Sequence, residues 1–165
     1  GRRSDQLILD ALATTTSATV GTSGAPLTVK TLLAAKRALD AKGVPSTDRY
    51  FVIEAKGIED LLKTTEVTSS DYNTVKALVG GDLNSFLGFK IIQLANRAEG
   101  GIAANGANFK GFAYHKSAVG FGLNMDISTK AEWVAHKQSW LSVGNLKAGA
   151  ALIDNEGVVP VIYAI

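Results

Sequence analysis

The 165-residue sequence contains no cysteine and only two histidines. The absence of cysteine excludes disulfides, thiol nucleophiles and cysteine-ligated zinc, and it favours an intracellular origin over an oxidising compartment. No apolar run approaches the roughly 18–20 residues of a membrane-spanning helix. The opening segment, residues 1–10, lacks a secretion cleavage pattern. We therefore expect a soluble protein with no membrane partner.

Concentrated charge is also absent. Seventeen basic residues face 15 acidic ones, for a net charge of +2, and no block of five or six like charges occurs. A nucleic-acid-binding module would gather basic residues on one surface, so the composition argues against that class. With 46% hydrophobic residues, the chain suits one compact domain or two small lobes sharing a core.

The N-terminal two thirds of the sequence alternate between helical and strand patterns. Thr28 as N-cap, apolar residues at helical spacing, and Gly43 and Pro45 as terminators make residues 28–43 the clearest helix. The same criteria predict, in order, a helix over 4–12, a loop over 13–26, a strand over 49–55, a helix over 56–64, a helix over 68–81 and a strand over 86–96.

The last third is mostly β after a loop rich in Gly, Ala and Asn, "RAEGGIAANGANFKG", which we expect to be flexible and exposed. Strand patterns follow over residues 111–115, 118–124 and 131–144. The segments "GAALI" and "VVPVIYAI" flank "DNEG" and predict a C-terminal β-hairpin. Pro160 cannot donate to a ladder, which places the last strand at an edge or a bulge. The fold class is α+β.

The triplet His115, Lys116 and Ser117 is the first candidate for catalysis. In a strand, His115 and Ser117 share a face while Lys116 points away, so the three cannot converge. No G-x-S-x-G turn occurs, and no acid is aimed at His115. We interpret the triplet as an ordinary strand junction and predict no catalytic residues.

Metal and cofactor sites lack their usual patterns. His115 and His136 have no second ligand at metal spacing. "GTSGAP" lacks the Lys-Ser/Thr ending of a P-loop, and "GGIAANGANFKG" is followed by a strand instead of a helix. We therefore predict neither a metal nor a cofactor.

Two tryptophans give a hint of an interface. Trp133 and Trp140 lie seven residues apart in a β pattern, which predicts opposite faces, with one indole in the core and the other covering a neighbour.

Five segments, taken together and in order, resemble the major capsid proteins of tailed bacteriophages, which have the Hong Kong 97 fold. They span nearly the whole chain: "SDQLILDAL", "GVPSTDRYFVIEAKGIEDLL", "SSDYNTVKALVGGDLNSFLGFKII", "GFAYHKSAVGFGLNMDI" and "GAALIDNEGVVPVIYAI". The resemblance implies a structural, non-enzymatic subunit that self-assembles into an icosahedral shell.

The resemblance also implies a division of the chain. Residues 1–26 would hold the end of the spine helix and a loop of the peripheral domain, 27–110 mainly the axial domain, and 111–165 a β-rich return, mainly to the peripheral domain. The family's N-terminal arm and extended loop have no counterpart before Gly1, so we expect a truncated subunit. The crosslinking lysine of that loop is missing too, and no crosslink is predicted.

Partners follow from the same resemblance. They are other copies of the chain in pentamers and hexamers, a scaffolding protein, and packaged DNA by non-specific proximity only. The location would be the virion capsid, assembled in the bacterial host cytoplasm. We expect residues 97–111 and "TTEVTSSDYN" to form interface loops. The candidate interface residues are Glu66, Ser69, Asp71, Tyr72, Glu99, Asn105, Asn108, Trp133 and Trp140.

Three alternatives stay open. A small hydrolase could use Ser117 and His115, and a separation beyond hydrogen-bond reach would exclude it. A ligand-binding α+β domain would show a deep apolar pocket with converging polar groups. A decoration or scaffolding protein is the third, although the spine-helix-like start argues against it.

Overall fold

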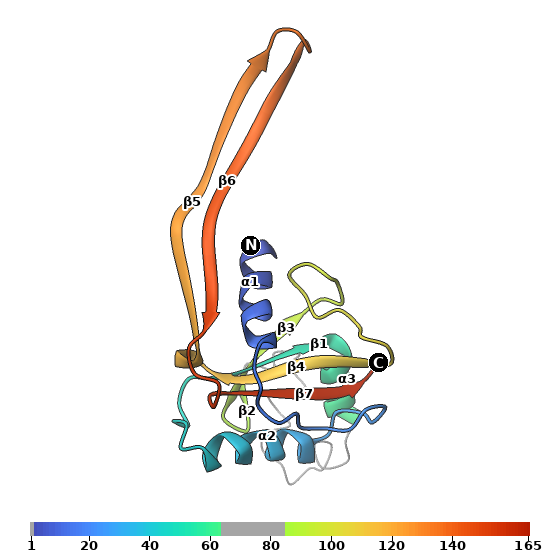
Figure 1. Ribbon diagram of the computed structural model, residues 1–165. Helices are drawn as coiled ribbons and strands as arrows, with labels where there is room; N and C mark the ends of the chain where they lie inside the picture. The colour runs from blue at the N-terminus through green and yellow to red at the C-terminus, as the bar shows by residue number, and fades with distance from the viewer. Residues whose placement is uncertain (1, 64–84) are drawn as a thin grey trace.

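The computed structural model describes residues 2–63 and 85–165. A five-stranded sheet with helices packed on it forms the body, and a long two-stranded hairpin projects from that body (Figure 1). The elements in chain order are α1 (Arg2–Ala13), α2 (Val29–Ala41), β1 (Arg49–Glu54), α3 (Ala55–Lys63), β2 (Ser85–Phe86), β3 (Phe89–Leu94), β4 (Asn108–His115), the 3-10 turn η1 (Lys116–Ala118), β5 (Val119–Val134), β6 (Ser139–Leu152) and β7 (Val158–Ala164).

These elements confirm the α+β class and the helices predicted near residues 4–12, 28–43 and 56–64. The helix predicted over 68–81 lies outside the described residues. The prediction of one strand over residues 86–96 was wrong, because two strands, β2 and β3, lie there. Leu87 and Gly88 both have positive φ, at 52° and 85°, and reverse the chain, so β2 pairs back on β3.

The order of the main sheet is β2-β3-β1-β4-β7. Strand β1 runs parallel to β3 and antiparallel to β4, and β4 is antiparallel to β7. Helices α2 and α3 lie on this sheet, while α1 stands beside the hairpin (Figure 1). Helix α2 turns Val29, Leu32, Ala35 and Leu39 into the core at the spacing that gives a helix one apolar side.

The ends of α2 follow from its sequence. The Thr28 side chain accepts a hydrogen bond from the Thr31 N–H, which satisfies one donor that the helix leaves unpaired. Gly43 then takes a φ of +70°, a conformation that costs little only for glycine. The helix therefore begins and ends where the capping residues predicted.

Strand β7 is the edge strand that Pro160 predicted, because only β4 pairs with it over its length. The Pro160 carbonyl accepts from the Val20 N–H at 2.9 Å, so the loop after α1 covers part of this edge.

The predicted C-terminal hairpin was wrong. Segment 149–153 ends β6 in the projecting hairpin, whereas β7 joins the main sheet. The reason is burial. Val158, Val159, Val161 and Tyr163 are all almost fully buried, and a strand apolar on both faces needs cover on both. Strand β6 instead alternates between exposed and half-buried residues near its end.

Arg49 is a buried cation at the start of β1, with 2% of its surface exposed. Its guanidinium donates to the carbonyls of Val44 (2.6 Å) and Pro45 (2.8 Å), and it pairs with Asp40 at 2.6 Å. The side chain therefore ties the end of α2 and the following turn to the central strand.

We predict that Arg49→Met lowers the free energy of unfolding by about 2–3 kcal/mol, because two carbonyls and a carboxylate lose their donor. Urea unfolding followed by circular dichroism measures the loss. Lys90→Met is the matched control, since it removes the exposed pair of Lys90 with Asp48 and should change stability little. Equal losses in the two variants would contradict the assignment.

Tyr163 is fully buried beneath α3, and its hydroxyl oxygen accepts from the Glu54 N–H at 3.0 Å. Burial raises the pKa of Tyr163 to about 12, because the ionised phenolate would lose its hydration. The unfolded chain has the ordinary value near 10. Tyr163 therefore stabilises the folded state fully below pH 10, and this contribution is lost as the pH rises towards 12.

We predict that Tyr163→Phe makes the free energy of unfolding fall less steeply between pH 10 and pH 12 than in the parent chain. Chemical unfolding at a series of pH values measures this slope. Burial also raises the pKa of Tyr114, but that residue acts equally in both proteins, so the difference isolates Tyr163. Parallel slopes would contradict the prediction.

Candidate functional site

The projecting hairpin is the main candidate for a functional surface, because β5 and β6 form a separate two-stranded sheet outside the main sheet. Strands β5 and β6 reverse at residues 135–138, where the N–H of Lys137 bonds the Val134 carbonyl and Gln138 has a φ of 47°. The single strand predicted over 131–144 was therefore wrong. The turn "AHKQ" contains no Gly, Pro, Asn or Asp, so the sequence carried no signal for it.

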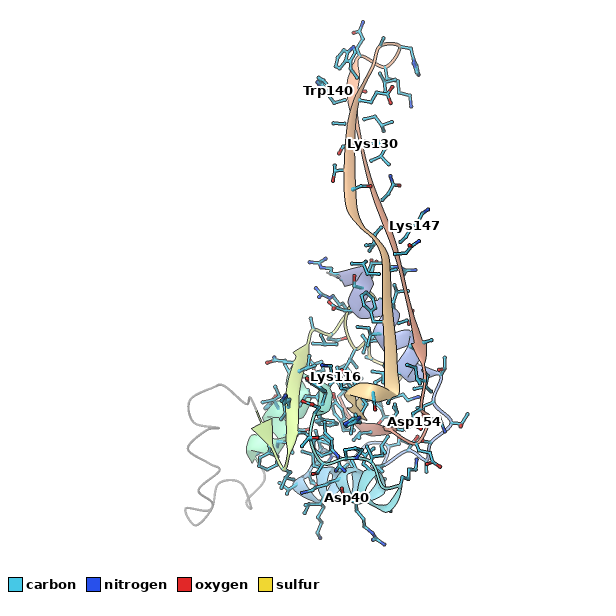
Figure 2. The ribbon with its side chains drawn as sticks, turned by 90° about the vertical axis from the view of Figure 1, so that its left-hand side faces the viewer. Asp40, Lys116, Lys130, Trp140, Lys147 and Asp154 are labelled. Atoms are coloured by element: carbon cyan, nitrogen blue, oxygen red, sulfur yellow. The ribbon has the colours of Figure 1, made fainter. Side chains whose placement is uncertain are left out.

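This reversal also overturns the prediction for the tryptophans. Trp133 and Trp140 are direct cross-strand partners on one face, with ring centroids 5.6 Å apart in an edge-to-face arrangement. Neither lies in the core, since Trp133 is 50% and Trp140 is 70% exposed. Figure 2 shows Trp140 near the far end of the hairpin, away from the sheet.

We call residues 128–145 the hairpin arm. All of them are exposed except the half-buried Val134. Towards the body, Leu146, Ala148, Ala150 and Leu152 become half-buried, and these residues share a face with Trp140. Helix α1 stands against this part of β6 (Figure 1). The body thus supports the base of the hairpin, and within residues 2–63 and 85–165 nothing covers the arm.

The two faces of the arm are distinct. The helix-side face carries Trp133 and Trp140 and continues into the residues that α1 covers. The open face carries the pairs Lys130 with Val143 and Glu132 with Leu141. Lys130 and Lys147 are spaced along the hairpin in Figure 2.

A bend separates the arm from the base. The register shifts between Leu123 and Met125 and again between Met125 and Ser128, so that β5 has two more residues than β6 over this stretch. Extra residues of this kind bend and twist a strand. A shallow open hollow lies beside the bend, and Gly122, Asn124 and Lys147 are among its lining residues.

The His-Lys-Ser triplet forms a local cap. His115 Nδ1 lies 2.7 Å from Ser117 Oγ and accepts from the Ser117 N–H at the start of η1. Separation therefore does not exclude the hydrolase alternative. The geometry nevertheless differs from a catalytic triad, because no carboxylate bonds His115 within the described ranges and the imidazole nitrogen is engaged in capping.

The ligand-binding alternative finds little support. An apolar hollow between α1 and the main sheet is lined by Ile8, Leu12, Val52, Ile92 and others. Its volume of about 90 Å³ is well below the roughly 300–1,000 Å³ of typical ligand pockets. Asp5 supplies its one carboxylate, so polar groups do not converge there. The hollow beside the bend is larger, at about 640 Å³, but it lies open to solvent on the surface of the hairpin.

The remaining predicted interface residues fall in two regions. Glu99 and Asn105 are exposed in the loop beside α1, well away from the hairpin tip (Figure 1). Asn108 begins β4 and is used inside the fold, since its side chain accepts from the Gly24 N–H and donates to Ser23 Oγ. Glu66, Ser69, Asp71 and Tyr72 lie outside the described residues, as does the whole of "TTEVTSSDYN".

Within residues 2–63 and 85–165, no helix is both long and apolar enough to cross a bilayer. Over the same residues, His, Asp and Glu side chains form no group of three or more that could hold a metal ion.

Comparison with known proteins identifies one family for this sequence. A model of the family described as "Phage capsid protein" matches residues 1–164. No curated protein matches the sequence significantly.

Solved capsid structures share the fold. The chain is similar to the Mycobacterium phage Che8 structure, with a TM-score of 0.70 and 20% identity over 96% of this chain and 55% of that one. It is similar to the head structure of Helicobacter pylori bacteriophage KHP40, with a TM-score of 0.73 and 12% identity over 98% and 64%. The acidic stable capsid of Helicobacter pylori bacteriophage KHP30 gives 0.74 and 11% over 99% and 66%. The chain thus spans between just over half and two thirds of these proteins, and the predicted capsid fold is confirmed.

We predict that the chain does not hydrolyse 4-nitrophenyl acetate above the rate of free imidazole, and that Ser117→Ala changes neither this rate nor the folded structure appreciably. The reason is that His115 Nδ1 is engaged in the local cap, and no acid among residues 2–63 and 85–165 bonds its ring. Absorbance at 400 nm follows the reaction. A burst of product that disappears in Ser117→Ala would instead establish a nucleophilic serine.

Proposed function

Because the chain belongs to the phage capsid protein family, we propose that it forms the structural subunit of a bacteriophage shell and binds other copies of itself. The observation that carries this proposal is the hairpin arm. Its two tryptophans, Trp133 and Trp140, are 50% and 70% exposed and lie outside the core. Large aromatic side chains contribute strongly to interfaces when they leave water. Burial of these indoles against another copy would remove them from water.

The proposal includes several partners. Copies would group in pentamers and hexamers of an icosahedral shell, in the virion capsid, after assembly in the bacterial host cytoplasm. A scaffolding protein would bind during assembly, and packaged DNA would contact the shell without sequence specificity. The near-neutral net charge of +2 supports self-association, because like copies repel one another only weakly. The role is structural and needs no catalytic site.

We further propose that α1 and the β5–β6 hairpin belong to the peripheral domain and that the α2–β3 region belongs to the axial domain. The boundaries of the two parts, residues 27–110 for the axial domain and 111–165 for the return to the peripheral domain, stay predictions. Strands β4 and β7 lie in one sheet with β1 and β3, which gives the two parts a shared core.

The loop that holds Glu99 and Asn105 is proposed as a second contact. Its base is anchored, since the Gly100 N–H donates to Gln6 Oε1 at 2.9 Å and the Ile102 N–H donates to the Ala95 carbonyl. Glu99, between these anchors, and Asn105, beyond them, have exposed side chains that remain accessible to a neighbour. Amide exchange that is equally fast in free subunits and shells would contradict this contact.

We predict that Trp140→Ser impairs assembly and leaves the folded subunit intact, because Trp140 lies outside the core and its only ring contact is with Trp133 on the same hairpin. Sedimentation velocity and negative-stain electron microscopy measure the particles, and circular dichroism checks the fold. Leu33→Ser is the matched control, since Leu33 is a 47% exposed apolar residue on α2. Normal shells from Trp140→Ser would contradict the role of the arm.

A further inference from the structure

The loop before β4 contains an asparagine followed by glycine, Asn105-Gly106, and this pair occurs nowhere else in the sequence. Asparagine is one of the chemically labile residues of proteins. Its side-chain carbonyl carbon can be attacked by the backbone nitrogen of the next residue. Glycine favours this attack, because it has no Cβ to crowd the approach and its backbone rotates more freely than that of other residues.

The chain forms a tight turn here that leaves the attacking nitrogen free. The Asn105 N–H donates to the Asn108 carbonyl at 2.8 Å, and the Asn108 N–H donates to the Asn105 carbonyl at 3.2 Å. Gly106 follows Asn105 in this turn with a φ of +62°. Within residues 2–63 and 85–165 its N–H has no hydrogen-bond acceptor. Beyond its chain neighbours, no described atom lies within 4 Å of the place that a Cβ would take.

The Asn105 side chain is also unrestrained. It is exposed, and in the part of the chain that the structure describes it makes no hydrogen bond. Asn108, at the other end of the turn, is held firmly. Its Oδ1 accepts from the Gly24 N–H and its Nδ2 donates to Ser23 Oγ, both at 2.8 Å. Phe109 follows Asn108 and lies in the ladder between β4 and β7. The two asparagines of one turn therefore offer their amides very differently.

We propose that Asn105 is a site of spontaneous covalent modification, at which its side-chain amide becomes a carboxylate through a cyclic imide with Gly106. The Gly106 nitrogen gives its proton to water or hydroxide and bonds to Asn105 Cγ. The Cγ–Nδ2 bond breaks, and Nδ2 takes up a proton and leaves as ammonia. Water then opens the ring. Attack at Cγ gives aspartate, whereas attack at the former backbone carbonyl gives isoaspartate, whose main chain runs through Cγ.

The modification depends on this turn alone and not on the proposed function. Water is the only co-reactant, and no electrons are transferred. Both products replace a neutral amide by a carboxylate, so the chain gains one negative charge at an exposed position.

The isoaspartate product should also open the turn. It adds a carbon to the main chain between residues 105 and 106, so the paired groups of Asn105 and Asn108 no longer lie opposite each other. The Ala107 carbonyl accepts from the N–H of Ile165, the residue after β7, at 3.1 Å. Opening of the turn therefore reaches the end of the main sheet.

Ageing of the full chain in mildly alkaline buffer, followed by tryptic digestion and mass spectrometry, tests the inference. Trypsin releases residues 98–110 as one peptide, whose only side-chain amides are those of Asn105 and Asn108. We expect the peptide mass to rise by about one dalton, with fragment ions that place the change on Asn105 and include isoaspartate. Asn108 is the internal control and should stay unchanged. An unaltered Asn105, or equal conversion of the two asparagines, would overturn the inference.

Two variants test the chemistry. Asn105→Gln keeps an amide but requires a larger ring, so we expect residues 98–110 to keep their mass. Gly106→Ala should slow the conversion by roughly tenfold or more, because its Cβ crowds the attack. Alanine is strained at a φ of +62°, so circular dichroism must confirm its fold, and Asn105→Gln is free of this strain. Conversion of the peptide in Asn105→Gln at the parent rate would place the reactive amide elsewhere and overturn the inference.

Hydrogen exchange checks the effect on the turn. We expect the isoaspartate form, separated by ion exchange, to exchange faster than the parent at residues 105–108 and at Ile165. Asn105→Asp is the matched control, since it carries the same charge without the extra main-chain carbon, and it should exchange like the parent. Equal exchange in the isoaspartate form and the parent would contradict the opening of the turn.

Discussion

The antiparallel pairing of β4 with β7 is the constraint on which the rest of the structure depends. Its register runs from Asn108 opposite Ala164 to Tyr114 opposite Val158. The hairpin leaves the sheet just after β4 and returns to it just before β7, so both of its ends are held by neighbouring strands. Three backbone bonds close the base. The His115 N–H donates to the Gly157 carbonyl, and the N–H groups of Ile153 and Asp154 both donate to the Ala118 carbonyl. The sheet thereby fixes where the arm begins.

In this arrangement the body provides the stability of the subunit, and the hairpin arm provides the surface proposed to bind other copies. The body buries its apolar residues against the sheet and anchors α2 through Arg49, whereas the arm places its largest side chains in water. A shell needs individual contacts that are weak enough to correct errors and numerous enough to be stable together. A firmly held base with a bent arm outside the core suits that requirement.

The elements that sequence reasoning predicted correctly are those with strong local signals. Helix α2 has Thr28 and Gly43 at its ends, α1 has a clear apolar side, and Pro160 placed β7 at an edge. The capsid family was also accessible, because its specificity lies in five segments in order. The axial and peripheral boundaries and the interface residues stay predictions.

The errors have a common physical cause, which is that strand pairing is not local. A turn made of Ala135, His136, Lys137 and Gln138 has none of the usual turn residues, so β5 and β6 were predicted as other strands and the tryptophans were placed on opposite faces. Likewise, "DNEG" has the composition of a hairpin turn but connects two different sheets. Which sheet a strand joins depends on burial by distant residues, and the sequence around the turn does not contain that information.

Hydrogen exchange by mass spectrometry, on free subunits and on assembled shells, tests the central claim most directly. The account predicts that β4 and β7 exchange slowly in both states, and that residues 128–145 exchange quickly in free subunits and slowly in shells. Fast exchange of the arm in intact shells would contradict the account, because the arm would then be an appendage and not the contact that joins the copies.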